Sequence, residues 1–73
     1  MRKTNGATIR VLREALGIKQ NDLAARAGIK PGSLSEIETG KVQPRIETAR
    51  RIADELGVTL DSITYPVPDA VSA

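Results

Sequence analysis

Lysine and arginine are the side chains of this sequence whose placement most plainly suggests chemistry. All eleven of them lie in residues 1–51, together with five acidic residues, which gives this part a net charge of +6. Residues 52–73 contain four acidic residues and no Lys or Arg, a net charge of −4. This asymmetry is typical of a chain whose basic part binds a polyanion. Two solvated faces of opposite charge would give the same pattern.

The sequence lacks the side chains that enzymes and metal sites most often use. The 73 residues include no His and no Cys, which removes the commonest general base and the usual zinc ligands. The sequence also has no paired carboxylates or phosphate-binding loop in a recognisable setting. We therefore expect no enzymatic activity, no metal site and no cofactor.

The length allows one small domain. A core is marginal below about 80 residues, and without Cys no disulfide can reinforce it, so tight helix packing, self-association or both must stabilise the fold. Apolar runs are far shorter than the roughly 18 residues that a membrane span needs. No apolar signal segment follows the basic start. The sequence predicts a cytoplasmic protein with no membrane contact.

Glycines divide the chain into short helical segments. Gly17, Gly28, Gly40 and Gly57 each follow a segment with helical periodicity, and Gly is favoured just past a helix end. The predicted helices cover residues 6–16 (with Asn5 as N-cap), 20–27, about 31–39, from after Pro44 to 56, and a short fifth turn at 60–63. Residues 1–5 are expected to form an N-terminal arm, 6–64 the domain and 65–73 a flexible tail. No strand alternation is present, and Leu16 and Ile46 are expected to face inward.

Residues 20–38 fit a helix-turn-helix unit, which is two short helices joined by a tight turn containing Gly. Ala24 is small where the two helices approach, Gly28 permits the turn, and Pro31 suits the first turn of the second helix. The outward residues of that second helix are mostly small and polar, so its exposed face can enter a groove. An ordinary helical hairpin within a small bundle would show similar spacing.

Several linked blocks from about Ile9 to Ile63 resemble the lambda-repressor-like, Cro/C1-type (XRE) helix-turn-helix family. The resemblance is carried by residues 9–13, 17–20, 23–24, 27–29, 34–41, Pro44, 52–53 and 56–58. It implies an all-α, compact five-helix domain that binds double-stranded DNA. The resemblance further implies a homodimer, with the helix at about 31–39 in the major groove.

Arg13 and Glu38 are charged residues on otherwise apolar helix stripes. Arg13 lies beside Ile9 and Leu12, and Glu38 follows Leu34 by four residues. Because an unpaired charge is costly to bury, we predict that the two form a structural ion pair. Extension of both side chains to solvent is the alternative.

The resemblance also implies which residues contact DNA. Gln20 and the preceding Lys19 correspond to a backbone-contacting helix start. The base-reading positions are Lys30, Pro31, Gly32, Ser33, Ser35 and Glu36. A second backbone-contacting segment comprises Thr39, Lys41, Arg45 and Thr48.

Four of these positions depart from the commoner pattern of the family. Lys19 replaces the Thr or Ser that is common just before this helix, which loses a cap and adds a cation. Pro31 and Gly32 offer no side-chain hydrogen bond to a base. Glu36 either accepts a hydrogen bond from cytosine N4 or is simply solvated. Outside the set, Arg2 and Lys3 are expected to add non-specific affinity as part of the arm. Arg50 and Arg51 are expected to pair with nearby acidic residues of the same helix.

The sequence-based hypothesis is a sequence-specific transcriptional regulator, expected to be a repressor. The alternative is an antitoxin-type or mobile-element control protein that binds DNA and also a protein partner, through the segment that starts at Tyr65. The resemblance implies a dimer contact within residues 56–63, where Leu60 or Ile63 either faces the partner or closes the small core.

Overall fold

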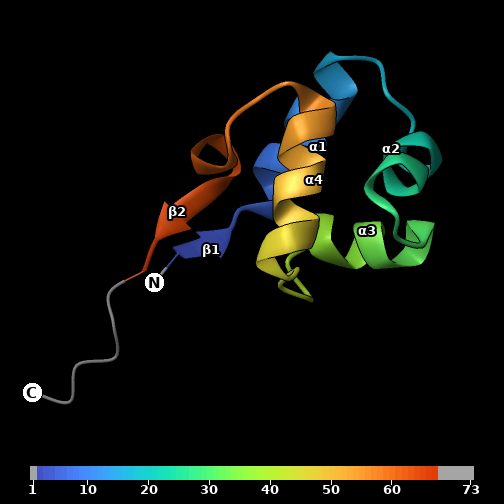
Figure 1. Cartoon of the computed structure of the whole chain (residues 1–73). Coiled ribbons are helices and arrows are strands. Elements are labelled where there is room, and N and C mark those ends of the chain that lie inside the picture. The colour runs from blue at the N-terminus through green and yellow to red at the C-terminus, as the bar shows by residue number, and fades with distance from the viewer. Residues whose placement is uncertain (1, 68–73) are drawn as a thin grey trace, which may run out of the picture.

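The computed structural model describes residues 2–67 and shows a mostly helical domain (Figure 1). Its elements are β1 (Arg2–Thr4), α1 (Gly6–Ala15), α2 (Gln20–Ala27), α3 (Pro31–Glu38), α4 (Ile46–Leu56), the 3-10 helix η1 (Leu60–Ile63) and β2 (Thr64–Pro66). The expected five-helix, all-α domain is corrected in two respects. The fifth helix is a single 3-10 turn, and the two chain ends form a small antiparallel sheet. None of the described helices has the length and apolar character to cross a membrane.

The helix boundaries follow from local sequence chemistry. Asn5 caps α1, because its side-chain oxygen accepts a hydrogen bond from the backbone N–H of Thr8 at 3.2 Å. Helices α2 and α4 end at Gly28 and Gly57, whose φ angles of +73° and +71° lie in the left-handed region that glycine adopts most easily. The sequence therefore predicts these helix ends well.

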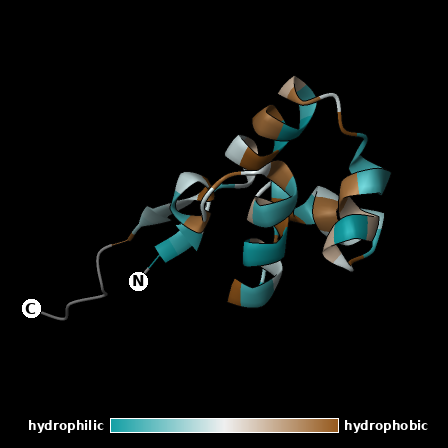
Figure 2. Ribbon diagram, turned by 45° about the horizontal axis from the view of Figure 1, so that its top comes forward, coloured by the Kyte–Doolittle hydropathy of each residue, from teal (hydrophilic) through white to brown (hydrophobic). Residues whose placement is uncertain are grey.

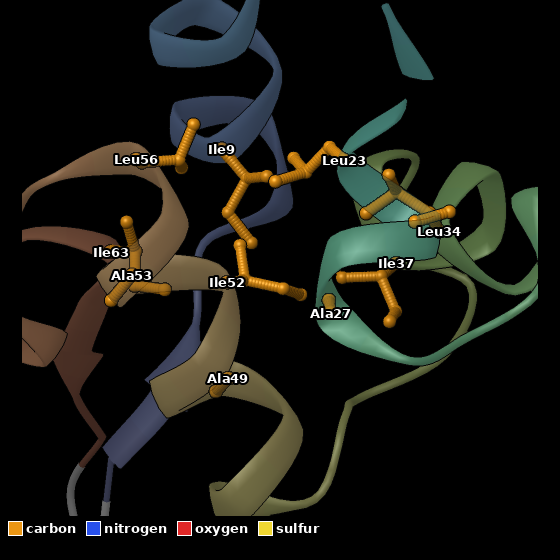
Figure 3. Packing of buried hydrophobic residues seen from close by; sticks show 11 residues of the cluster. Ile9, Leu23, Ala27, Leu34, Ile37, Ala49, Ile52, Ala53, Leu56 and Ile63 are labelled. Carbon is orange, nitrogen blue, oxygen red and sulfur yellow. The ribbon is translucent and has the colours of Figure 1, made fainter. Parts of the chain in front are cut away.

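One aliphatic core holds the four α-helices and η1 together. Figure 3 shows side chains from all of these elements meeting between α1, α2, α3 and α4. The fully buried large side chains are Ile9, Leu23, Leu34, Ile52 and Ile63. Helix α4 carries hydrophobic and hydrophilic residues side by side along its length (Figure 2), as an amphipathic helix that covers a core must.

Two sequence predictions about apolar residues are wrong, and one open alternative is decided. Leu16 is 55% exposed and Ile46 is 59% exposed, because Leu16 follows the last residue of α1 and Ile46 is the first residue of α4. Ile63 is completely buried in the core. Ile63 therefore belongs to the core, which was one of its two expected roles, and Leu60 keeps some exposure.

The two chain ends pair as a hairpin-like sheet. Lys3 lies opposite Tyr65, and Thr4 opposite Thr64. The Arg2 guanidinium reinforces the pair by donating to the Thr64 hydroxyl at 2.9 Å and to the Thr64 carbonyl at 3.2 Å. Residues 2–4 are therefore a strand and not the expected free arm, and the expected tail begins inside β2. The remainder of that tail, residues 68–73, lies outside the described part of the chain.

Helix α1 begins in direct contact with the end of α3. Gly6 is buried, and a Cβ atom at this position would overlap the carbonyl oxygen of Ile37 and lie 2.9 Å from the Cα of Glu38. Only glycine allows the two backbones to approach this closely. The start of α1 thus fixes the position of the last turn of α3.

Candidate nucleic-acid interface

A tight turn connects α2 and α3. After Gly28 reverses the chain, the backbone N–H of Ile29 returns to the Ala24 carbonyl at 2.9 Å. Lys30 then adopts an extended conformation, and Pro31 opens α3. Leu23 and Leu34 are buried on the inner sides of the two helices, so the outer face of α3 is left for another molecule.

The outer face of α3 carries the predicted base-reading residues. Ser35 is half-buried, and the others, Lys30, Pro31, Gly32, Ser33 and Glu36, are exposed. The Thr39 hydroxyl, at the end of α3, lies 3.0 Å from the Ser35 carbonyl and 3.2 Å from the Glu36 carbonyl. Its proton therefore stays within the protein, and only the lone pairs of its oxygen face outward. This makes Thr39 a poorer phosphate donor than the sequence suggests.

Arg13 and Glu38 form the predicted ion pair beneath this face. The Arg13 Nε lies 2.7 Å from Glu38 Oε2, and Nη2 lies 3.1 Å from Oε1, so the contact is bidentate. The side chains are only 11% and 2% exposed. The hydrogen bond to Glu38 raises the pKa of Arg13 above its ordinary value, against the opposing effect of burial. Arg13 also donates to the Ile18 carbonyl at 3.0 Å, which ties the α1–α2 turn to the same pair.

Gln20, the first residue of α2, joins this pair. Its amide nitrogen donates to Glu38 Oε1 at 3.1 Å. Glu38 therefore orients the side chain that the sequence predicts to contact the DNA backbone. An amide nitrogen carries two N–H groups, and the second one stays available to an outside acceptor. Glu38 therefore connects α1, α2 and α3 at one point.

A shallow hollow of about 270 Å³ opens above this point. It is lined by Arg10, Arg13, Gln20, Ser35, Glu38 and Thr39. Arg10 is a residue that sequence reasoning missed, because the helical stripe places it outside the core and no motif marks it. Residues three apart are neighbours on a helix surface. The position of Arg10 three residues before Arg13 could therefore have indicated that it lies near the ion pair. Arg10 also lies 3.4 Å from Glu14 in an exposed ion pair.

Three consecutive helices begin with a cation in place of a capping side chain. Lys19, Lys30 and Arg45 are the N-cap residues of α2, α3 and α4, and none makes a side-chain hydrogen bond to its helix. Ser, Thr, Asp or Asn would satisfy the free amides there, and a cation opposes the positive end of the helix dipole. These starts reduce the stability of the fold and suit a bound anion such as phosphate.

The remaining predicted contacts lie around the α3–α4 loop. Lys41 and Arg45 are exposed, Thr48 is half-buried one turn into α4, and Lys19 is exposed before α2. Arg50 and Arg51 are exposed on α4 but form no ion pair with any acidic residue among residues 2–67, which corrects the expected helical pairing. Arg51 instead reaches the turn, where its Nη1 is 3.0 Å from the place of a Cβ at Gly28.

Comparison with known proteins places this geometry among helix-turn-helix domains. Residues 9–63 match the family HTH_3, described as helix-turn-helix. The chain is 32% identical over 69 residues to the uncharacterized HTH-type transcriptional regulator y4dJ of Sinorhizobium fredii, covering 94% of this chain and 90% of that one. It is 34% identical over 58 residues to an uncharacterized HTH-type transcriptional regulator of Haemophilus influenzae, covering 80% of this chain. There it spans only 59% of the relative's length.

The fold is also similar to that of a solved repressor. The structure of the P22 c2 repressor protein in complex with a synthetic operator superimposes with a TM-score of 0.74 at 27% identity. The match covers 77% of this chain and 85% of that one. The fold of this chain is therefore similar to that of a repressor whose structure was solved with its operator.

Proposed function

The chain belongs to the helix-turn-helix family HTH_3, and from that premise we propose that it is a repressor-like transcriptional regulator that binds double-stranded DNA with α3 in the major groove. The observation that carries the proposal is the run of three uncapped helix starts at Lys19, Lys30 and Arg45. A sequence selected only for stability would cap these helices. A sequence selected to bind phosphates keeps both the amides and the cations exposed.

Base reading and backbone binding fall to different residues in this proposal. Ser33 and Glu36 are exposed on α3 and face base edges, where Glu36 accepts a hydrogen bond from cytosine N4. Lys30, the exposed N-cap residue of α3, binds a phosphate. The other residues of this face lie close to the groove as α3 enters it; they are Pro31, Gly32 and Ser35. Phosphate binding uses Lys19, Gln20, Lys41, Arg45 and Thr48, with Thr39 as a weaker contact and Arg10 as an addition from the structure.

The proposed assembly is a homodimer on a two-fold symmetric site. Helix-turn-helix dimers place two copies of the DNA-reading helix in successive major grooves, about 10 base pairs apart. Ile46 and Leu60 line one hollow with β1, which leaves apolar surface near the segment expected to form the dimer contact. Because a transcriptional regulator must reach the DNA, the proposal includes a cytoplasmic location.

Selection of bound sequences from random duplex DNA tests the function directly. The purified chain should enrich one motif with two-fold symmetry, because α3 reads base edges and the dimer repeats the reading. Analytical ultracentrifugation on the enriched duplex should then show two chains per site. A pool that stays random after repeated selection would contradict the proposed function, and a single chain per site would contradict the dimer.

Restoring a helix cap should separate stability from binding. We expect Lys30→Ser to stabilise the fold by about 0.5–1 kcal/mol, because a serine hydroxyl satisfies a free amide of α3. The same change should weaken DNA binding and reduce the salt dependence by about one phosphate contact. Urea unfolding and fluorescence anisotropy measure the two effects. Arg26→Gln, which removes an exposed cation from the last turn of α2, is the control and should leave binding unchanged.

A further inference from the structure

Backbone hydrogen bonds hold the loop between α3 and α4 only at its two ends. At the α3 end, the backbone N–H of Lys41 returns to the Glu36 carbonyl at 2.9 Å. At the α4 end, Ala49 N–H bonds the Arg45 carbonyl at 2.9 Å and starts the helix. The middle of the loop, at Gln43, has no backbone hydrogen bond of this kind. Two of the proposed phosphate-binding cations, Lys41 and Arg45, stand two residues on either side of it.

The Gln43 side chain fixes the middle of this loop to β1. Its Oε1 accepts a hydrogen bond from the Thr4 backbone N–H at 2.9 Å, and its Nε2 donates to the Thr4 carbonyl at 3.3 Å. A glutamine amide has the donor and acceptor of a peptide group, so it pairs with the free edge of β1 as a third strand would. Thr4 is only 8% exposed, and losing both partners would leave buried backbone groups unsatisfied.

Strand β1 is itself held by the other end of the chain. Thr4 pairs with Thr64 of β2, and the next residue, Asn5, donates its backbone N–H to the Ile63 carbonyl at 2.7 Å. Tyr65 of β2 borders the same hollow as Gln43 and Gly40. A continuous set of contacts therefore runs from the C-terminal strand, through Thr4 and Gln43, to the loop that carries Lys41 and Arg45.

We propose that Gln43 is a positioning residue for DNA binding: its amide anchors the α3–α4 loop on the terminal sheet and holds Lys41 and Arg45 where two phosphates can meet them. This inference rests on the proposed DNA-binding function. Gln43 need not touch DNA, because its two polar groups are already occupied by Thr4. The terminal sheet thereby becomes part of the DNA-binding apparatus and does more than close the chain ends.

Gln43→Met tests the anchor, because methionine has a similar length and neither a donor nor a strong acceptor. Anisotropy on the selected duplex should show about 3- to 30-fold weaker binding, a size similar to the effect on coupling of residues that do not contact the ligand. The salt slope should also become less steep. Val42→Ala, at a 45% exposed position of the same loop, is the matched control and should bind as the parent chain does. Circular dichroism should show cooperative unfolding for both variants.

A double-mutant cycle distinguishes positioning from direct contact. In a Lys41→Ala, Arg45→Ala background, Gln43→Met should weaken binding by less than about twofold, because the residues that it positions are gone. An undiminished loss in that background, or unchanged affinity in the parent background, would overturn the inference. Gln43→Asn, which stays neutral but is shorter by one methylene and cannot reach both Thr4 groups as glutamine does, supplies the same cycle if the methionine variant does not fold. If the parent chain binds no duplex at all, the proposed function fails with the inference; if it binds and Gln43→Met has no effect, only the inference fails.

Discussion

Glu38→Ala should lower the free energy of unfolding by about 3–5 kcal/mol, the usual effect of removing one partner of a buried ion pair. The change leaves the Arg13 guanidinium, whose side chain is 11% exposed, without its bidentate acceptor. It also removes the acceptor of the Gln20 amide at the start of α2. Small domains have a total stability of only about 5–15 kcal/mol, so this one substitution should bring the chain close to unfolding.

Urea denaturation followed by circular dichroism measures this effect. Glu36→Ala removes the same chemical group from an exposed position of the same helix and should change stability by less than about 0.5 kcal/mol. Glu38→Ala combined with Arg13→Ala should be far less destabilising than the sum of the two single changes, since the double variant contains no unpaired buried charge. Additive effects would show that the pair is not coupled.

The pair should add little pH dependence from its arginine side. The Glu38 hydrogen bond raises the pKa of Arg13 in the folded chain. When folding raises the pKa of a cationic group, that group stabilises the fold fully at every pH below its ordinary pKa. This stabilisation is lost only as the pH rises through the pKa of the folded state. For arginine both limits lie far above neutrality, so stability that depends on Arg13 stays constant from pH 6 to 9. Unfolding measured across that range in the Glu38→Ala variant and its parent should show a constant difference.

Gly6→Ala should destabilise the fold by about 3 kcal/mol, at the upper end of what overpacking typically causes. The added methyl group would overlap the Ile37 carbonyl and lie 2.9 Å from the Cα of Glu38, both of which are backbone atoms. A backbone cannot rotate aside as a flexible side chain can, so α1 must move away from the end of α3. That shift would also disturb the Arg13–Glu38 contact.

Gly32→Ala is the matched control for this glycine. A Cβ at Gly32 would have no atom within 4 Å, and replacing glycine by alanine inside a helix stabilises by about 0.5–1 kcal/mol. The two substitutions add the same methyl group and should shift the melting temperature in opposite directions. Equal shifts in a thermal unfolding experiment would contradict the close approach of α1 and α3.

The helices were predictable because their ends are chemically marked. Gly28, Gly57 and Pro31 determine where α2, α4 and α3 end or begin, and these signals act over a few residues. The Arg13–Glu38 pair was also predictable, since each charge interrupts an apolar stripe and a buried charge needs a partner. Local rules of this kind do not require knowledge of which segments meet in space.

The features that were missed depend on contacts between distant segments. The strands β1 and β2 have three residues each, and their paired residues lie 60 to 64 positions apart in the sequence, so neither shows a detectable alternation. Gly6 looks like an ordinary helix start until α3 is packed against it. The role of Gln43 depends on the buried edge of β1, and no spacing rule links residue 43 to residue 4. The same holds for Gln20, whose amide partner lies 18 residues away.

The salt dependence of DNA binding tests the central claim, that the uncapped starts of α2, α3 and α4 bind phosphates. The parent chain, with about five to seven phosphate contacts, should give a log–log slope of about −5 to −6 per bound chain on the selected duplex. Changing Lys19, Lys30 and Arg45 together to serine should reduce the magnitude of that slope by about 3 and should not lower the stability of the fold. Changing Arg26, Arg50 and Arg51 together to glutamine, with the same loss of charge, should change it much less. Equal slopes for the parent chain and the serine variant would contradict this account.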